Sequence, residues 1–223
     1  MALNGANMQR QTSTALAQFG RLAAEGCESD AFVRRLCEES GPNLGPDLAD
    51  AVHLLCALHG HHPGLIAIAA DRSEDENVRS WLAGTSESFE RERSFLLHLT
   101  AAVGPIPSTT GAAETESSLS AARHAVETLA NSERSGCALG AVCALVADWP
   151  AIRAVLDRAA LRSGIEGPVP TLPDRAALGE VIDHVAASPA AARALAFGSE
   201  QLLLQHRAVF ALLEARSESR GDY

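Results

Sequence analysis

Gly136-Cys137-Ala138-Leu139-Gly140-Ala141-Val142-Cys143-Ala144 is apolar on every face when it is drawn as an α-helix. A helix without a polar face has to be buried on all sides. Gly136, Gly140 and Ala144 are spaced by four residues, so they form one ridge of small side chains where another backbone can approach closely. The segment therefore predicts the central helix of a multi-helix bundle, with Cys137 and Cys143 as small core residues.

Capping residues and helix breakers predict helices on both sides of this segment. Ser29 is expected to cap a helix, Pro46 to stand in the first turn of another, and Trp149-Pro150 to separate two helices by a kink. No convincing strand is found, so we expect an all-α, single-domain bundle of roughly eight or nine helices over residues 1–223, with frayed ends at 1–8 and 218–223. The predicted helices span residues 9–25, 29–39, 47–59, 74–103, 113–131, 132–148, 150–162, 173–187 and 189–217, with a short apolar segment at 64–70.

The composition of the chain limits which partners it can bind and in which cellular compartment it is expected. The net charge of −10 argues against a nucleic-acid partner, because phosphate binding needs a basic surface. The five cysteines are odd in number and include no C-x-x-C pair, which argues against a secreted disulfide framework. The N-terminus lacks an apolar signal core, and the longest apolar run, residues 137–147, is about half of a membrane span. We expect a soluble, cytoplasmic protein that does not enter a membrane.

Three polar residues fall on stripes of the predicted helices that should face the core. Glu92 lies between Phe89 and Leu96, His206 between Leu202 and Val209, and His59 ends the helix that carries Leu55 and Leu58. A carboxylate and two imidazoles that point inward from three helices resemble the ligand sets of metal sites in helix bundles. His59, Glu92, His206 and Glu127, which lies three residues after His124, are therefore candidate metal ligands. The alternative is that each is a hydrogen-bonded polar group with a structural role.

A second candidate site follows the loop Gly104–Gly111. Ser108, Thr109 and Thr110 precede a helix N-terminus, whose free N–H groups favour an anion. Together with Arg123 and His124 they are candidate ligand-binding residues. Simple capping of the following helix is the alternative interpretation.

Several short segments resemble the signature region of an uncharacterised bacterial family, a domain of unknown function from alphaproteobacteria. These are Gly104-Pro-Ile-Pro-Ser-Thr-Thr-Gly111, Arg123-His124-Ala125, Ser135-Gly136-Cys137-Ala138-Leu139-Gly140 and Asp148-Trp149. The resemblance implies no activity, but it suggests that the proline-rich loop, Arg123 and His124 share one neighbourhood. The layout is also similar to haem-oxygenase-like and ferritin-like bundles, at the level of the fold alone.

Two classes of function remain open at this point, and with them the question of whether the chain is an enzyme. The first is a protein without a recognisable catalytic motif that binds a small or anionic ligand or another protein, with a homodimer as one arrangement. The second is a haem-oxygenase-like or ferritin-like oxidoreductase with iron or haem as its cofactor and its ligands inside the bundle.

Overall fold

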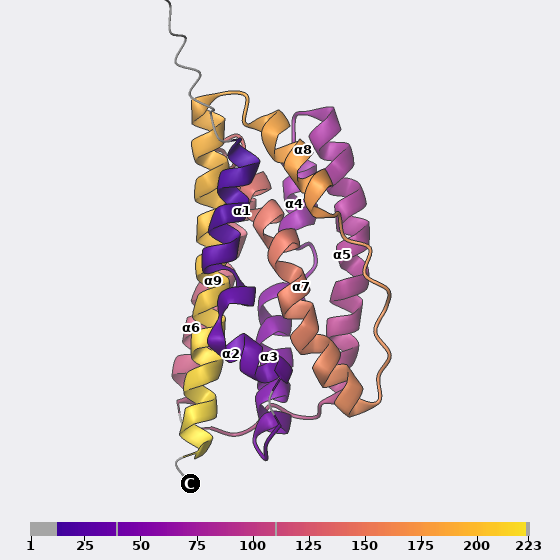
Figure 1. Cartoon of the computed structure of the whole chain (residues 1–223), viewed down its shortest axis with the longest axis vertical. Helices are drawn as coiled ribbons and strands as arrows, with labels where there is room; N and C mark the ends of the chain where they lie inside the picture. Colours follow the sequence, from indigo (N-terminus) through magenta and orange to yellow (C-terminus); the bar gives the residue numbers. More distant parts are fainter. Residues whose placement is uncertain (1–12, 39, 110, 222–223) are drawn as a thin grey trace, which may run out of the picture.

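The chain folds into a bundle of α-helices, seen in a computed structural model that describes residues 13–38, 40–109 and 111–221 (Figure 1). These residues form nine α-helices, one short 3-10 helix and no strand, which confirms the predicted all-α class. The elements are α1 (Thr14–Glu25), η1 (Cys27–Ser29), α2 (Ala31–Glu38), α3 (Leu44–His59), α4 (Leu65–Arg72), α5 (Glu76–Ala102), α6 (Ala112–Ala130), α7 (Cys137–Ser163), α8 (Arg175–Val185) and α9 (Pro189–Gly221).

The apolar segment at 136–144 forms the first turns of α7, and α7 packs most extensively against α9. The two backbones meet at glycines. A Cβ atom on Gly140 would lie 2.1 Å from the carbonyl oxygen of Leu195, and one on Gly198 would lie 2.0 Å from that of Cys137. The predicted close approach along the small-residue ridge is therefore confirmed, and α9 is the helix that makes it.

Figure 1 shows α7 inclined through the middle of the bundle, with α9 along one long side and α5 along the other. The segment 164–174 runs back along the outside of α5. It is held there by Arg153, which donates to the carbonyl oxygen of Pro168 at 2.7 Å, and by Arg91, which donates to Thr171 at 2.9 Å. The connection covers the face of α5 that carries Phe95.

The expected interruption at Trp149-Pro150 is wrong, because α7 is one continuous helix from Cys137 to Ser163. Pro150 lies at an exposed position, so its ring points away from the packed core. The helix also begins at Cys137 instead of Ser132, after a turn in which Gly136 adopts a φ of 93°. That left-handed conformation is accessible to glycine without strain.

By length and composition α7 could cross a membrane, but 78% of its most apolar 18-residue window is buried inside the bundle. Other helices of the same chain cover it on several sides, with α2, α3, α5, α6, α8 and α9 all in contact with it. This burial is typical of the central helix of a soluble protein.

The starts of α2 and α8 are fixed by carboxylates. Asp30, and not Ser29 as predicted, caps α2 by accepting from the N–H groups of Phe32 and Val33. Asp174 caps α8 through the N–H of Ala177. Ser188 caps α9 through the N–H of Ala191, as its Ser-Pro sequence predicts.

The predicted fraying after residue 217 is wrong for residues 218–221, which continue α9 as far as Gly221. Arg216 and Arg220, near that end, both bind Asp50 of α3, and Arg220 also binds Asp47. Asp50 is fully buried, so these charges are paired inside the molecule and hold the end of α9 against α3. Residues 1–8 and 222–223 lie outside the described part.

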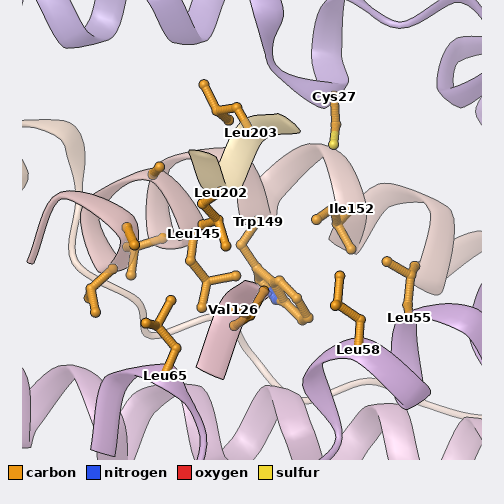
Figure 2. Close-up of a cluster of buried hydrophobic side chains, with 14 of the residues drawn as sticks. Cys27, Leu55, Leu58, Leu65, Val126, Leu145, Trp149, Ile152, Leu202 and Leu203 are labelled. Atoms are coloured by element: carbon orange, nitrogen blue, oxygen red, sulfur yellow. The ribbon is translucent and has the colours of Figure 1, made fainter. Parts of the chain in front are cut away.

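The core is centred on Trp149, whose indole ring is almost completely buried. Figure 2 shows it among Val126, Leu145, Ile152 and Leu58, side chains that come from α3, α6 and α7. The sulfur of Cys27 points into the same interior from η1. The functional candidates described next surround this indole.

A buried histidine chain beside a cavity

Three buried polar side chains from three different helices form a line of hydrogen bonds through the core. Nδ1 of His206, on α9, lies 2.6 Å from Oδ2 of Asp148, on α7. Nε2 of His206 lies 3.1 Å from Nε2 of His59, the last residue of α3. Asp148, His206 and His59 are 3%, 1% and 7% exposed, so water does not screen these contacts.

The junction between α1 and α2 closes around the carboxylate of Asp148. The backbone N–H of Cys27 donates to Oδ1 at 2.7 Å, and its thiol donates to Oδ2 at 2.9 Å. Gly26 makes this approach possible, because a Cβ atom there would lie 2.8 Å from Oδ1. Asp148 is thus held by three donors and has the partners that a buried carboxylate requires.

Burial and hydrogen bonding set the charges along this line. Burial lowers the pKa of His59 well below its ordinary value, and the neighbouring His206 lowers it further, so the imidazole of His59 is neutral. Burial alone would raise the pKa of Asp148, but the hydrogen bonds from His206 and Cys27 outweigh it and the pKa is lowered. Burial, followed by the charge of Asp148, raises the pKa of the Cys27 thiol well above its ordinary value. The line therefore runs from an ionised carboxylate to a neutral imidazole.

Aromatic rings fix the orientation of the His59 imidazole. Its plane stands nearly perpendicular to the rings of Trp149, Phe89 and His206, at interplanar angles of 84°, 81° and 85°. Among the described residues, none makes a hydrogen bond to Nδ1 of His59. The ring is therefore rigidly placed, with one nitrogen bound to His206 and the other without a partner in the part of the chain that the structure describes.

His59 also lines a cavity of about 60 Å³ that lies under α4. Most of the cavity wall is apolar, with contributions from α4, α5, α6 and α7. Its apolar lining includes Leu58, Pro63, Leu65, Ile66, Ile68, Phe89, Val126, Ala130 and Leu145. By the measure of about 10–15 Å³ for each water molecule, this space holds about four to six waters. A cavity that encloses a benzene ring has about 150 Å³, so a ring the size of phenol would fill this space and extend into its mouth.

The mouth of the cavity carries charged side chains that are already paired. Arg93 donates to Glu90 at 2.7 Å and to the carbonyl oxygen of Gly60 at 3.2 Å. Arg123 lies 3.0 Å from Nε2 of His61, and its Nε lies 3.8 Å from Glu127. The rim thus joins the turn after α3 to α5 and α6.

The sequence-predicted metal ligands are only partly brought together. His59 and His206 are in contact, and Glu127 lies on the cavity rim. Glu92 is buried but fully engaged elsewhere, since its carboxylate accepts from Arg153 at 2.7 and 2.8 Å and from the indole N–H of Trp149 at 3.0 Å. In the described part of the chain, the one group of three metal-binding side chains that converges within 4.8 Å is Cys27, Asp148 and His206.

The members of the predicted anion site are separated. Arg123 follows Gly111 by twelve residues of α6, which at 1.5 Å each is about 18 Å. Ser108 is exposed, and the preceding Pro107 accepts a hydrogen bond from Arg216 instead of meeting Arg123. The side chain of His124 is exposed to solvent, and Thr110 lies outside the described residues.

Asp148 and Cys27 are not among the site residues that the sequence predicts. Asp148 had a usable signal, because it is the first charged residue after the apolar run 137–147. A lone carboxylate on a fully buried helix needs partners inside the protein. Cys27 had none, since it stands in a short polar junction whose packing against α7 depends on the tertiary fold.

A comparison with models of protein families gives a match. A family model described as "Family of unknown function (DUF6975)" matches residues 22–221. The matched range includes Cys27, His59, Asp148 and His206 and the entire cavity lining. No curated protein and no solved structure matches the chain.

Proposed function

Since the chain belongs to the DUF6975 family, a family of unknown function, we propose from its geometry that it is a small-molecule-binding protein whose ligand occupies the cavity beside His59. The neutral imidazole of His59, fixed by His206 and Asp148, is the polar group that the ligand meets there. This single feature carries the proposal.

The fixed imidazole supports a binding role because one of its nitrogens is held by the interior and the other is left for a ligand. Nδ1 of His59 is not one of the fully buried side-chain atoms that lack a partner, so a molecule in the cavity can reach it. Nδ1 of His59 lacks a partner among the described residues, while the opposite nitrogen is held at 3.1 Å by His206. A ligand with one hydroxyl, carbonyl or similar group would complete the hydrogen bonding of the ring.

The lining of the cavity indicates the rest of the ligand. An apolar wall with a few polar groups at fixed positions is the usual composition of a small-molecule site. The space of about 60 Å³, which is open to solvent at its rim, suits a short alkyl chain or a single ring that extends into the mouth. The arginines of the rim are already paired with Glu90, Glu127 and His61, so the ligand needs no strong negative charge.

We place this activity in the cytoplasm. All five cysteines are free in the structure, as expected for a protein of a reducing compartment. The net charge of −10 argues against nucleic acid as a partner.

Thermal unfolding in the presence of phenol and toluene tests the proposal. The two probes have the same shape, and only phenol offers a hydroxyl to His59. We expect both to raise the unfolding temperature, and phenol to bind about 2- to 10-fold more tightly, which is the effect of one net hydrogen bond.

The variant His59→Phe should keep the toluene effect and lose the preference for phenol. His98→Ala, which removes an exposed histidine of α5 away from the cavity, is the matched control and should behave as the unmodified protein. Equal affinities for phenol and toluene in the unmodified protein, or an unchanged preference in His59→Phe, would contradict the proposed role of His59.

A further inference from the structure

We propose that Cys27, Asp148 and His206 form a buried binding site for a divalent transition-metal ion of the zinc class. The site lies behind His59, on the side of the histidine chain away from the cavity. Its ligands come from η1, α7 and α9, so the ion would join three elements that are far apart in the sequence. The proposal does not depend on the ligand-binding function.

The geometry of the three side chains suits a metal ion. Their ligand atoms all lie within 4.8 Å of one another, and all three residues are buried. Around tetrahedral zinc, with bonds of about 2.0–2.3 Å, ligand atoms stand roughly 3.3–3.6 Å apart. Oδ2 of Asp148 lies 2.9 Å from Sγ of Cys27 and 2.6 Å from Nδ1 of His206, so side-chain shifts of about 0.7 Å open the site.

The charges of the ligands match a divalent ion. A metal replaces two protons, one on the Cys27 thiol and one on Nδ1 of His206. The proton between the two Nε2 atoms then resides on His206, and Nδ1 of His59 carries the proton of the neutral His59 ring. The Cys27 thiolate and the Asp148 carboxylate then supply two negative charges, and His206 is neutral. The assembly has no net charge, which lowers the cost of holding it in the core.

The chemistry of the donor atoms selects the kind of metal. One sulfur, one imidazole nitrogen and one carboxylate oxygen are a mixed set that zinc accepts, whereas magnesium and calcium prefer oxygen alone. Divalent zinc also binds such a set more tightly than divalent iron does. Iron is therefore the weaker competitor at this site.

Neighbouring groups orient the ligands as they do in known metal sites. A histidine that binds metal through one nitrogen uses the other for a hydrogen bond. Nε2 of His206 has such a partner in Nε2 of His59, and Oδ1 of Asp148 is fixed by the backbone N–H of Cys27. Because the site is closed by α1, α7 and α9, the ion would be taken up as the chain folds and would exchange slowly.

Cobalt substitution tests this site on the full-length protein. Cells grown in minimal medium with Co²⁺ should yield protein with one Co²⁺ per chain and a near-ultraviolet charge-transfer band from a cobalt–thiolate bond. Zinc-grown protein should contain one Zn²⁺ per chain, and its removal with a strong chelator should lower the unfolding temperature. Protein that folds with its full helical signal but holds neither ion would overturn the proposal.

Cysteine variants test whether Cys27 supplies the thiolate that binds the metal. Cys27→Ser should lose the charge-transfer band, and the matched variant Cys37→Ser, which changes a half-buried cysteine, should keep it. If Cys27→Ser does not fold, a chain with Cys37→Ser, Cys56→Ser, Cys137→Ala and Cys143→Ala keeps Cys27 as its only thiol and should still show the band. A band that survives in folded Cys27→Ser, or that disappears in the chain with Cys27 alone, would overturn the assignment.

Discussion

Nδ1 of His206 lies 2.6 Å from Oδ2 of Asp148, in a part of the core where both side chains are at most 2% exposed. This contact joins α9 to α7 near the middle of both helices. It also fixes the ring whose other nitrogen meets His59. The orientation of His59 toward the cavity therefore depends on a carboxylate that does not itself line the cavity.

Replacing the carboxylate of Asp148 by an amide should lower the stability of the fold. Asp148→Asn puts an NH₂ group among three donors, and one partner of a buried pair is lost without compensation. We expect a loss of about 3–5 kcal/mol in the free energy of unfolding, measured by urea denaturation. Asp71→Asn, at an exposed position of α4, should change it by no more than about 0.5 kcal/mol.

The neutral state of His59 makes the stability of the protein sensitive to acid. The pKa of His59 is lowered in the fold, whereas in the unfolded chain it is about 6.5. Below that pH the unfolded chain binds a proton that the folded chain does not, so this group lowers the stability by about 1.4 kcal/mol per pH unit until its folded pKa is reached.

The measurement compares metal-free protein with His59→Phe between about pH 7.5 and 5.5, a range that straddles the unfolded pKa. The stability of the unmodified protein should fall more steeply toward acid than that of the variant. Parallel curves would mean that folding leaves the pKa of His59 unchanged, which would contradict a neutral, buried imidazole.

A methyl group at Gly140 should disrupt the close packing of α7 against α9. Gly140→Ala places a carbon 2.1 Å from the carbonyl oxygen of Leu195, which the backbone can relieve only by moving the helices apart. We expect a loss of about 1–3 kcal/mol or more in stability. Gly84→Ala, in α5 with open space around it, is the matched control and should raise the stability by about 0.5–1 kcal/mol.

The pair formed by Glu92 and Arg153 should act as a structural unit. Glu92→Gln leaves the buried guanidinium without a full counter-charge, and we expect a loss of about 3–5 kcal/mol by urea denaturation. Combining Glu92→Leu with Arg153→Met removes both charges and should cost less than the single change. If Glu92 were a metal ligand instead, Glu92→Gln would reduce the metal content of the protein as purified.

The fold was largely predictable because its main signal is local. The apolar segment at 136–144 predicts a buried helix, and the glycine spacing predicts a close neighbour. The continuous path of α7 through Pro150 was not predictable, because an exposed proline inside a packed helix depends on contacts elsewhere. The order at the end of α9 likewise comes from Asp47 and Asp50, which are far away in the sequence.

The candidate site was predicted in part. Helical phase correctly placed Glu92, His206 and His59 in the interior. Helical phase predicts which side chains are buried, but not which of them contact one another. It therefore groups Glu92 with the histidines, although Glu92 binds Arg153 and Trp149. The actual partners of His206 are Asp148 and His59, a juxtaposition that exists only after α3, α7 and α9 have packed.

A crystal structure of the protein with 4-bromophenol shows whether a small molecule binds in the cavity through His59. We expect an anomalous bromine peak among Leu65, Phe89 and Val126, with the phenol oxygen about 3 Å from Nδ1 of His59. A cavity that stays empty at saturating 4-bromophenol, or a bound probe whose oxygen points away from His59, would contradict it.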